Sequence, residues 1–380
     1  MKLFLLFILF IIGTNLYAEQ ILQNTTCKRC HPKIFNEYQN SMHHKASIYK
    51  DPIHKAIWDR HPDKKKDNYK CAKCHTPADK ALINKQIKLT PNKTQLNEPI
   101  SCQTCHQIKS IEKHAKANIN IYTTKKKTFF SKDLKRKGEK LIFHDKTSFF
   151  GLFHTTVGSP YHNIDYSNEN FYNANVCLGC HDHKQNEKGF VVCDIQIKQN
   201  DTKQNCISCH MPKIKGSFVN QHDTKKHAYH GSNIVTASPA MLEKYIKISL
   251  QKDQNKFSLI LENKANHTLF PHPLRLAVLK VSIQRNRKIT PLKEHKFVRI
   301  IGTDGKPTPP WLATTILKDT TLKAYEKREI TYNTKLEKKD QLIVKFGYHI
   351  VNPKIAKKLN IKDTHYTKFI TFKKKVFTIK

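Results

Sequence analysis

The sequence predicts an α+β chain made of two dissimilar parts, and three observations carry this prediction. Five Cys-x-x-Cys-His motifs all lie between residues 27 and 210, where the intervening fragments favour short helices and long loops. Runs rich in β-branched and aromatic residues follow after residue 250 and are typical of strands. Hydrophobic residues make up only 38% of the chain, so the first part needs additional apolar material for its core.

The first residues have the features of an export signal. A positive start at Met1-Lys2 precedes an apolar run over residues 3–12, and Leu16-Tyr17-Ala18 is an acceptable cleavage site. We therefore expect residues 1–18 to be a signal peptide and the exported chain to begin at Glu19. The apolar run is shorter than the roughly 20 residues that span a bilayer, and an uncleaved anchor is the alternative. Export in this form predicts a periplasmic location.

Residues 19–240 are predicted to form a mostly helical and loop-rich first domain that packs on its cofactors. The fragments 33–38 and 52–58 have helical character, whereas the basic segment 123–140 carries no motif and is predicted to run over the surface. The intervals between motifs are irregular, which excludes a regular repeat array.

Residues 241–380 are predicted to form a β-rich, sandwich-like second domain. A helix over 239–250 is expected to link the two domains. Several short strands bounded by turn signals such as Asp304-Gly305 favour a sandwich. The expected strands are 257–261, 276–283, 297–301, 329–332, 341–346 and 369–372.

The Cys-x-x-Cys-His motifs use ten of the eleven cysteines. In this spacing the two thiols bond to one c-type haem, and the histidine that follows becomes the proximal ligand of the iron. Structural zinc does not require that histidine, and a disulfide framework explains neither the spacing nor the histidine. The sequence therefore predicts five covalently bound haem c groups. The thiols are those of Cys27, Cys30, Cys71, Cys74, Cys102, Cys105, Cys177, Cys180, Cys206 and Cys209, and the proximal histidines are His31, His75, His106, His181 and His210.

The second axial position of each iron decides between electron transfer and the binding of external ligands. The chain has 22 histidines, so 17 remain after the five proximal ones, and the supply of distal ligands is not limiting. With only four methionines, histidine is the favoured distal ligand. Cys193 lies outside every motif. It could serve as a distal thiolate ligand or form an intermolecular disulfide, but we expect an inert, apolar residue. Distal candidates by context are His43, His114, His144, His154, His162, His222, His227, His230 and His267.

Several stretches resemble the multihaem cytochrome c-552/c-554-like family. Residues 27–46 (CKRCH…EYQNSMHHKA) resemble its opening, and CISCHMP over 206–212 resembles its Cys-x-x-Cys-His-Met-Pro motif. HAYHG over 227–231 resembles the stretch that follows, and NHTLFP over 266–271 resembles the segment that opens the C-terminal β domain. Asn266 and His272 stand where glycine or threonine is usual. The resemblance covers most of residues 25–290.

This resemblance implies a pentahaem member with a C-terminal β domain and closely stacked, mostly bis-histidine haems. His43, His227 and His267 inherit distal candidacy from their matching positions. His114, which follows the third motif, and His162, which precedes the fourth, complete the favoured set.

The charge of the chain bears on its partners. Lys and Arg number 68 against 30 Asp and Glu, a formal net charge of +38. Such a balance is common in nucleic-acid-binding proteins, but an export signal argues against that class. Haem propionates would offset part of the excess. The remaining positive charge would attract an acidic redox acceptor, or would bind the protein peripherally to anionic lipid. The alternative is that it only reflects a lysine-rich solvated surface.

The function predicted from the sequence is periplasmic electron transfer. The donor would be a quinol-linked membrane cytochrome and the acceptor a terminal reductase, so the chain is expected to be a carrier rather than an enzyme. The alternative is a reductase or oxidase of a small nitrogen or sulfur compound at one haem with an open coordination site. A third hypothesis gives the β module a partner-binding or redox-sensing role. Counting histidines does not separate the three.

Overall fold

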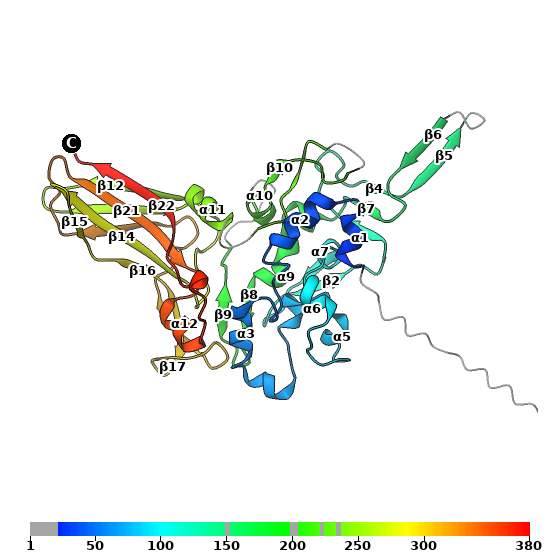
Figure 1. Ribbon diagram of the computed structural model, residues 1–380, viewed down its shortest axis with the longest axis horizontal. Helices are drawn as coiled ribbons and strands as arrows, with labels where there is room; N and C mark the ends of the chain where they lie inside the picture. The colour runs from blue at the N-terminus through cyan, green and yellow to red at the C-terminus, as the bar shows by residue number, and fades with distance from the viewer. Residues whose placement is uncertain (1–21, 149–152, 198–203, 221–223, 233–236) are drawn as a thin grey trace, which may run out of the picture.

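The computed structural model describes residues 22–148, 153–197, 204–220, 224–232 and 237–380 of the chain. Short helices and short strands alternate up to residue 245, and strands dominate after it. Figure 1 shows the long C-terminal strands gathered on one side and the small helices on the other. This mixture agrees with the predicted α+β class, while the domain boundary at 240/241 stays a prediction. The predicted signal peptide, 1–18, lies outside the described residues.

Most helices of the first part are a single short turn, and several begin at a side-chain cap. The Asp51 side chain begins α3 by accepting from the N–H groups of Ile53 and His54, and Asn205 begins α10 in a capping box with Ser208. The helices predicted at 33–38 and 52–58 are confirmed as α2 and α3. No helix among the described residues is long and apolar enough to cross a membrane. The helices are α1 (Asn24–Lys28), α2 (Pro32–Asn40), α3 (Pro52–Trp58), η1 (Pro62–Lys66), α4 (Ala72–His75), α5 (Lys80–Ile83), α6 (Lys93–Asn97), α7 (Cys102–His106), α8 (Glu169–Tyr172), η2 (Asn175–Cys177), α9 (Leu178–His181) and α10 (Cys206–His210).

The strands of the first part form two- and three-stranded sheets. Pairing is antiparallel except between β3 and β7, which are parallel. The prediction of a surface run at 123–140 is wrong in its middle, because Thr128 and Phe130 of β3 are buried, whereas Lys125–Lys127 are exposed as predicted. The strands are β1 (Ile108–Glu112), β2 (Ile119–Tyr122), β3 (Thr128–Phe130), β4 (Lys140–Leu141), β5 (His144–Ser148), β6 (Phe153–Val157), β7 (Asn163–Asp165), β8 (His183–Gln185), β9 (Val191–Asp194), β10 (Lys213–Lys215) and β11 (Lys226–Ala228).

The C-terminal part consists mainly of antiparallel strands in three sheets. One has the order β12-β13-β20, a second β15-β14-β21-β22 with β16 also paired to β14, and a third β18-β17-β19. Five of the six predicted strands are present, and the sixth, 297–301, is divided at Val298 between β16 and β17 of different sheets. The strands β12, β15, β18 and β19 were not predicted. The elements are α11 (Ala237–Tyr245), β12 (Ile246–Lys252), β13 (Phe257–Asn263), β14 (Leu276–Arg285), β15 (Lys288–Pro291), β16 (His295–Phe297), β17 (Arg299–Thr303), β18 (Lys306–Pro307), β19 (Thr315–Asp319), β20 (Lys327–Tyr332), β21 (Gln341–His349), α12 (Pro353–Leu359), η3 (Thr364–Tyr366) and β22 (Ile370–Thr378).

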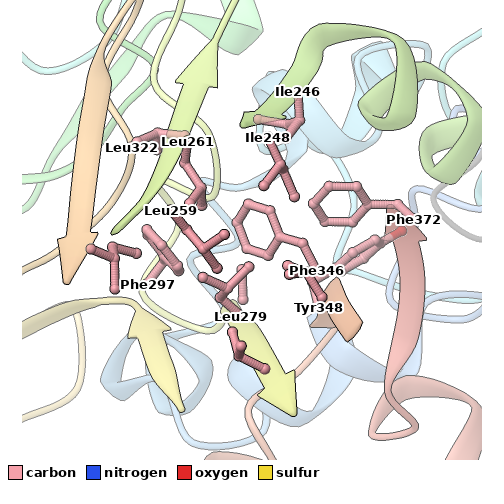
Figure 2. Packing of buried hydrophobic residues seen from close by; sticks show 14 of the residues in the cluster. Ile246, Ile248, Leu259, Leu261, Leu279, Phe297, Leu322, Phe346, Tyr348 and Phe372 are labelled. Carbon is pink, nitrogen blue, oxygen red and sulfur yellow. The ribbon is translucent and has the colours of Figure 1, made fainter. Parts of the chain in front are cut away.

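The first two sheets face each other and share one hydrophobic core. Leu259 of β13 contributes from one sheet, and Leu279 and Phe346, which are opposite each other in the β14–β21 pair, contribute from the other. All three side chains are completely buried. Figure 2 shows these side chains pointing into the space between the strands, with aromatic rings of β21 and β22 closing one end. This core contains no residue of the Cys-x-x-Cys-His motifs.

The linking helix is shorter than the sequence suggests. We expected a helix over 239–250, but α11 ends at Tyr245 and residues 246–252 form β12. Ile246 and Ile248 are buried whereas Lys247 between them is exposed, which is the two-residue period of a strand. Pairing with β13 and burial against the shared core override the local helical tendency.

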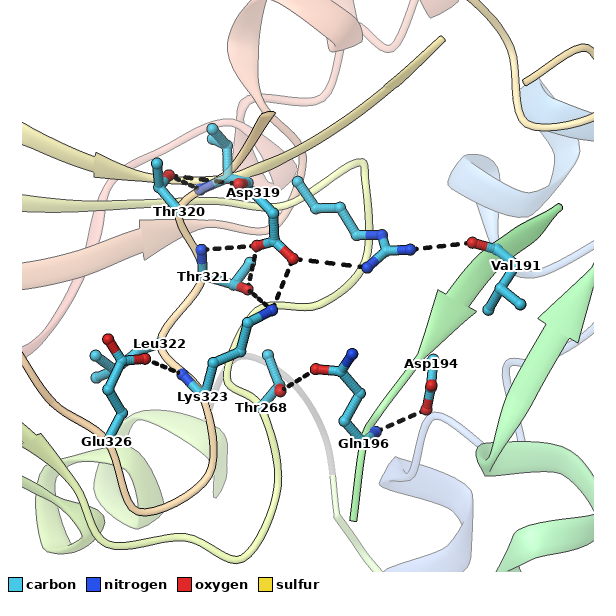
Figure 3. A network of polar contacts seen from close by, with 12 residues as sticks. Val191, Asp194, Gln196, Thr268, Asp319, Thr320, Thr321, Leu322, Lys323 and Glu326 are labelled. Atoms are coloured by element: carbon cyan, nitrogen blue, oxygen red, sulfur yellow. Dashed lines mark hydrogen bonds and ion pairs between the residues drawn. The ribbon is translucent and has the colours of Figure 1, made fainter. Parts of the chain in front are cut away.

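A polar network joins the two parts of the chain (Figure 3). The Arg299 guanidinium forms an ion pair with Asp319 and donates to the Val191 carbonyl of β9 over 3.0 Å. The Thr268 hydroxyl donates to the Gln196 side chain over 2.9 Å, and the Thr268 N–H donates to the Ile195 carbonyl. These bonds fix the segment that carries His267 against the first part.

Candidate functional site

Each Cys-x-x-Cys-His motif forms a helical turn. In a helix, residues i, i+3 and i+4 lie on one face, so both thiols and the histidine project to the same side. The His31 N–H donates to the Cys27 carbonyl over 2.8 Å, and the His75 N–H donates to the Cys71 carbonyl over 2.9 Å. A flat group bonded to both thiols would therefore have the motif histidine against one of its faces.

Four of the five motif histidines lie opposite a second histidine at nearly the same distance. A metal–imidazole bond is about 2.0 Å long and the ring centroid lies about 1.2 Å behind the nitrogen, so rings on opposite sides of one metal ion have centroids roughly 6.3 Å apart. This spacing fits a six-coordinate haem iron in each pair. The centroid distances are 6.2 Å for His31–His162, 6.1 Å for His43–His181, 6.3 Å for His106–His230 and 6.3 Å for His210–His267.

Backbone carbonyls orient several of these rings. A histidine that binds a metal through one nitrogen commonly donates its other ring N–H to a carbonyl, which fixes the tautomer and the ring plane. In each case below Nδ1 donates to the backbone, which leaves Nε2 for iron. The bonds are His31 to Phe218 at 2.6 Å, His106 to Phe130 at 2.8 Å, His230 to Ala228 at 2.7 Å and His267 to Thr268 at 2.9 Å.

Desolvation by the surrounding protein favours the neutral form of several of these imidazoles. Desolvation, assisted by a neighbouring histidine, lowers the pKa of His43, His210 and His230 to about 4. Desolvation also lowers the pKa of His106 and His181. The neutral imidazole is the form that binds a metal, so the rings suit axial ligation at neutral pH.

Three of the five predicted distal candidates lie opposite motif histidines. His43, in the turn after α2, faces His181; His162, just before β7, faces His31; and His267, in the loop between β13 and β14, faces His210. Each pair joins segments that are distant in the sequence, so the pairing itself was not readable from the sequence.

His227, another predicted candidate, has both ring nitrogens engaged elsewhere. Its Nδ1 donates to the Gly216 carbonyl over 2.8 Å, and its Nε2 lies 2.8 Å from the Glu37 carboxylate. His230 lies opposite His106 instead. The resemblance favoured His227, and no signal in the HAYHG stretch separates the two histidines.

His114, the fifth predicted candidate, is exposed, and its Nδ1 accepts from the Lys116 N–H in a local turn. His144 is exposed in β5, and His154 is exposed in β6, where it pairs with Asp145 at 2.8 Å. His222 lies outside the described residues.

The histidine of the second motif, His75, has a different neighbour. The ring of His54 lies only 3.9 Å from it between centroids, too short for an iron between the two. Both rings donate through Nδ1 to the Ala46 carbonyl, at 3.1 Å for His54 and 3.2 Å for His75. The remaining nitrogen of His54 accepts from the Tyr69 hydroxyl, 3.2 Å away. His54 therefore has no free lone pair, whereas Nε2 of His75 remains available.

Thiols of different motifs lie in contact. The thiols of Cys27 and Cys102 lie close enough to interact, which joins the first and third motifs. Contacts of the same kind, Cys74–Cys180 and Cys177–Cys206, join the fourth motif to the second and to the fifth. The attachment points are thus closely clustered. Cys193 is apart from them, half-buried in β9, and burial raises the pKa of its thiol, which agrees with an unreactive residue.

Comparison with known proteins identifies the class. Residues 26–107, which contain the first three motifs, match the family described as cytochrome c554 and c-prime. The chain belongs to the multihaem c-type cytochromes. This cytochrome therefore carries covalently bound haem c, and its motif histidines and their opposite partners fit that group.

A solved structure has the same fold along nearly the whole cytochrome. The penta-heme cytochrome c552 from Thermochromatium tepidum matches with a TM-score of 0.71 and 19% sequence identity, over 94% of this chain and 99% of that one. At this level of identity the likeness extends to the fold alone. None of the curated proteins matches this cytochrome.

Proposed function

We propose that this cytochrome binds five haem c groups and transfers electrons in the periplasm between a quinol-linked donor and a terminal acceptor. The observation that carries this proposal is the set of four histidine pairs at 6.1–6.3 Å. Haem iron held by two histidines supplies reversible one-electron oxidation and reduction without an open site. The protein's contribution is to hold both imidazoles of each pair in place.

The distal ligands follow from the pairs. We assign His162 to the haem of the first motif, His230 to the third, His43 to the fourth and His267 to the fifth. His230 replaces the sequence-based choice of His227, whose ring nitrogens are already hydrogen-bonded. His114 has no ligand role in this assignment.

The thiol contacts support an order for the haems. The proximity of Cys27 and Cys102 supports a first haem beside the third, and the electrostatic interaction of Cys105 with Cys177 supports a third haem near the fourth. Contacts from the fourth motif reach both the second and the fifth. The fourth haem is then a branch point, and the second and fifth haems are the ends of the two branches. Electrons that enter at the first haem would pass through the third and fourth haems to reach the second or the fifth.

The positive net charge of the chain supports the proposal that its electron acceptor is an acidic protein. With a formal net charge of +38, the chain attracts a negatively charged partner over a distance set by the ionic strength. We expect the rate of oxidation of the reduced protein by an acidic acceptor cytochrome to fall steeply as salt rises. A rate that is independent of salt would refute electrostatic docking.

The ligation is tested by low-temperature EPR of the fully haem-loaded, oxidised protein, with intact mass giving the number of haems. We expect five haems, of which four are low-spin and unchanged by cyanide. The fifth, at His75, should give a high-spin signal at a g value of about 6 that cyanide removes. Cyanide-sensitive signals from two or more haems would contradict the four assigned pairs.

A second function is favoured by the surroundings of His75. Because His54 is too close and fully hydrogen-bonded, the haem of the second motif lacks an assigned distal ligand among the described residues. An open iron at one end of the branch would let the chain reduce or oxidise a small nitrogen or sulfur compound. Binding of such a compound at this haem alone, with the other four unperturbed, is the distinguishing result.

A further inference from the structure

A groove lined with lysines lies where α11 meets β12 and β22. α11 packs on β22 and leads directly into β12, and the groove between them has a volume of about 430 Å³. Its lining includes one carboxylate, that of Glu243. The lysines that line it are Lys244, Lys247, Lys264, Lys373, Lys374 and Lys375.

Most of this positive charge is not paired within the protein. Among the described residues, Lys373 is the one groove lysine with an ion pair, to Glu243 at 4.0 Å. Glu262, opposite Lys247 in the β12–β13 pair, is a further carboxylate nearby. Six lysines beside these two glutamates leave an excess of positive charge, which attracts a negatively charged partner.

Two of the lysines hold the groove together, and the others are exposed. Lys373 donates to the Glu243 carbonyl over 3.0 Å, which ties β22 to α11. Lys375 donates to the Ile248 carbonyl of β12 over 2.8 Å. The shape of the groove is therefore set before a partner arrives. The exposed lysines are Lys244, Lys247, Lys264 and Lys374.

The groove lies beside the fifth motif. The hydroxyl of Tyr245, the last residue of α11, is 3.2 Å from Sγ of Cys209, and the Tyr245 carbonyl accepts from the Lys264 N–H over 2.9 Å. When haem is attached, Cys209 Sγ is a sulfur at the edge of the haem ring, so Tyr245 alone separates that edge from Lys264. Figure 1 shows α11 between α10, which contains Cys209, and the C-terminal strands.

We propose that this groove is the docking surface for an acidic redox protein that receives electrons, one at a time, from the fifth haem past Tyr245. The proposal rests on the proposed electron-transfer function, in which the fifth haem is the end of one branch. One electron leaves the ferrous iron, which becomes ferric, and reduces the partner's redox group, with no bond formed or broken. A concave surface admits protruding carboxylates of a protein, whereas a flat lipid surface would contact only its rims.

The test compares two triple variants with the unaltered, fully haem-loaded protein. The groove variant combines Lys244→Glu, Lys264→Glu and Lys374→Glu. The matched control makes the same change in net charge at the other end of the same sheet. It reverses Lys252, the last residue of β12, and Lys335 and Lys338, which follow β20. Both variants should keep four low-spin haems by EPR. If the groove variant unfolds, the milder change of the same three lysines to glutamine replaces it.

The probe is the soluble haem domain of cytochrome b5, an acidic one-electron protein. At low ionic strength we expect the groove variant to reduce it at least about tenfold more slowly than the control variant does. Calorimetric binding with both proteins oxidised, so that no electron moves, should weaken by at least about tenfold as well. At about 1 M salt, where the Debye length is about 3 Å, the two variants should agree within about twofold. A small neutral quinone should oxidise all three proteins equally fast.

Three results would overturn the inference. If the control variant loses as much rate and affinity as the groove variant, net charge guides the partner and the groove is not its docking surface. If only binding to phosphatidylglycerol vesicles is lost in the groove variant, the groove faces lipid. In both cases the electron-transfer function stands. If neither cytochrome b5 nor the quinone oxidises the reduced, unaltered protein, the electron-transfer function fails and the docking surface fails with it.

Discussion

Replacing His230 and His227 separately gives the sharpest test of the structural assignment, because the sequence favours one and the structure the other. In His230→Ala the ring opposite His106 is lost, and the haem of the third motif becomes five-coordinate. His227→Ala removes a ring that contacts Gly216 and Glu37 and faces no motif histidine among the described residues. The two variants should therefore differ in spin state and in stability.

The expected magnitudes follow from the assigned ligands. With four low-spin haems and one high-spin haem, His230→Ala lowers the low-spin EPR intensity per protein by about a quarter and doubles the high-spin intensity. His227→Ala should leave both intensities unchanged. It should instead lower the free energy of unfolding by about 3 kcal/mol, since the Glu37 carboxylate loses its partner in a buried setting and keeps only its bond from the His230 N–H.

The assay is spin-quantified EPR of oxidised protein at matched haem content, with chemical unfolding followed by circular dichroism. His114→Ala, a change at an exposed histidine, serves as the control and should alter neither quantity. An additional high-spin haem in His227→Ala, with none in His230→Ala, would refute the reasoning from ring distances and hydrogen bonds.

Two further predictions concern the C-terminal part. Leu279→Ala, at a completely buried core position, should lower the free energy of unfolding by about 3 kcal/mol, whereas Ile289→Ala, at a 58% exposed position of the same sheet, should cost far less in the same urea titration. A hydrogen bond from Arg285 lowers the pKa of Asp340, so this carboxylate stabilises the fold above its usual pKa of 3.8, and that contribution is lost as the pH falls through the lowered value. The Asp340→Asn variant should therefore have a lower free energy of unfolding than the unaltered protein near neutral pH. This difference in the free energy of unfolding should shrink as the pH falls below the usual pKa of 3.8. A difference that stays the same would contradict the pairing of Asp340 with Arg285.

Much of this cytochrome was predictable because its signals are local. Attachment of haem depends on residues three and four apart in one turn, and the strands 257–261 and 341–346 show the pattern of apolar and β-branched residues. The prediction of a helix over residues 239–250 was wrong at its C-terminal end. The helical tendency of these residues is local, whereas the strand at Ile246 and Ile248 depends on pairing with β13 and on a core built from distant segments.

The sequence by itself predicted the cofactor and the proximal histidines, since both follow from spacing within a few residues, and it predicted the α+β class from local strand and helix patterns. Only the tertiary structure shows that His230, not His227, lies opposite a motif histidine and that His54 lies beside His75. It also shows that His267, His272 and Arg275 of the C-terminal part lie near the first part. These choices depend on distances between segments far apart in the chain. Ring nitrogens that are already hydrogen-bonded to Glu37 or Tyr69 are lost as ligands, and no sequence pattern reports those bonds.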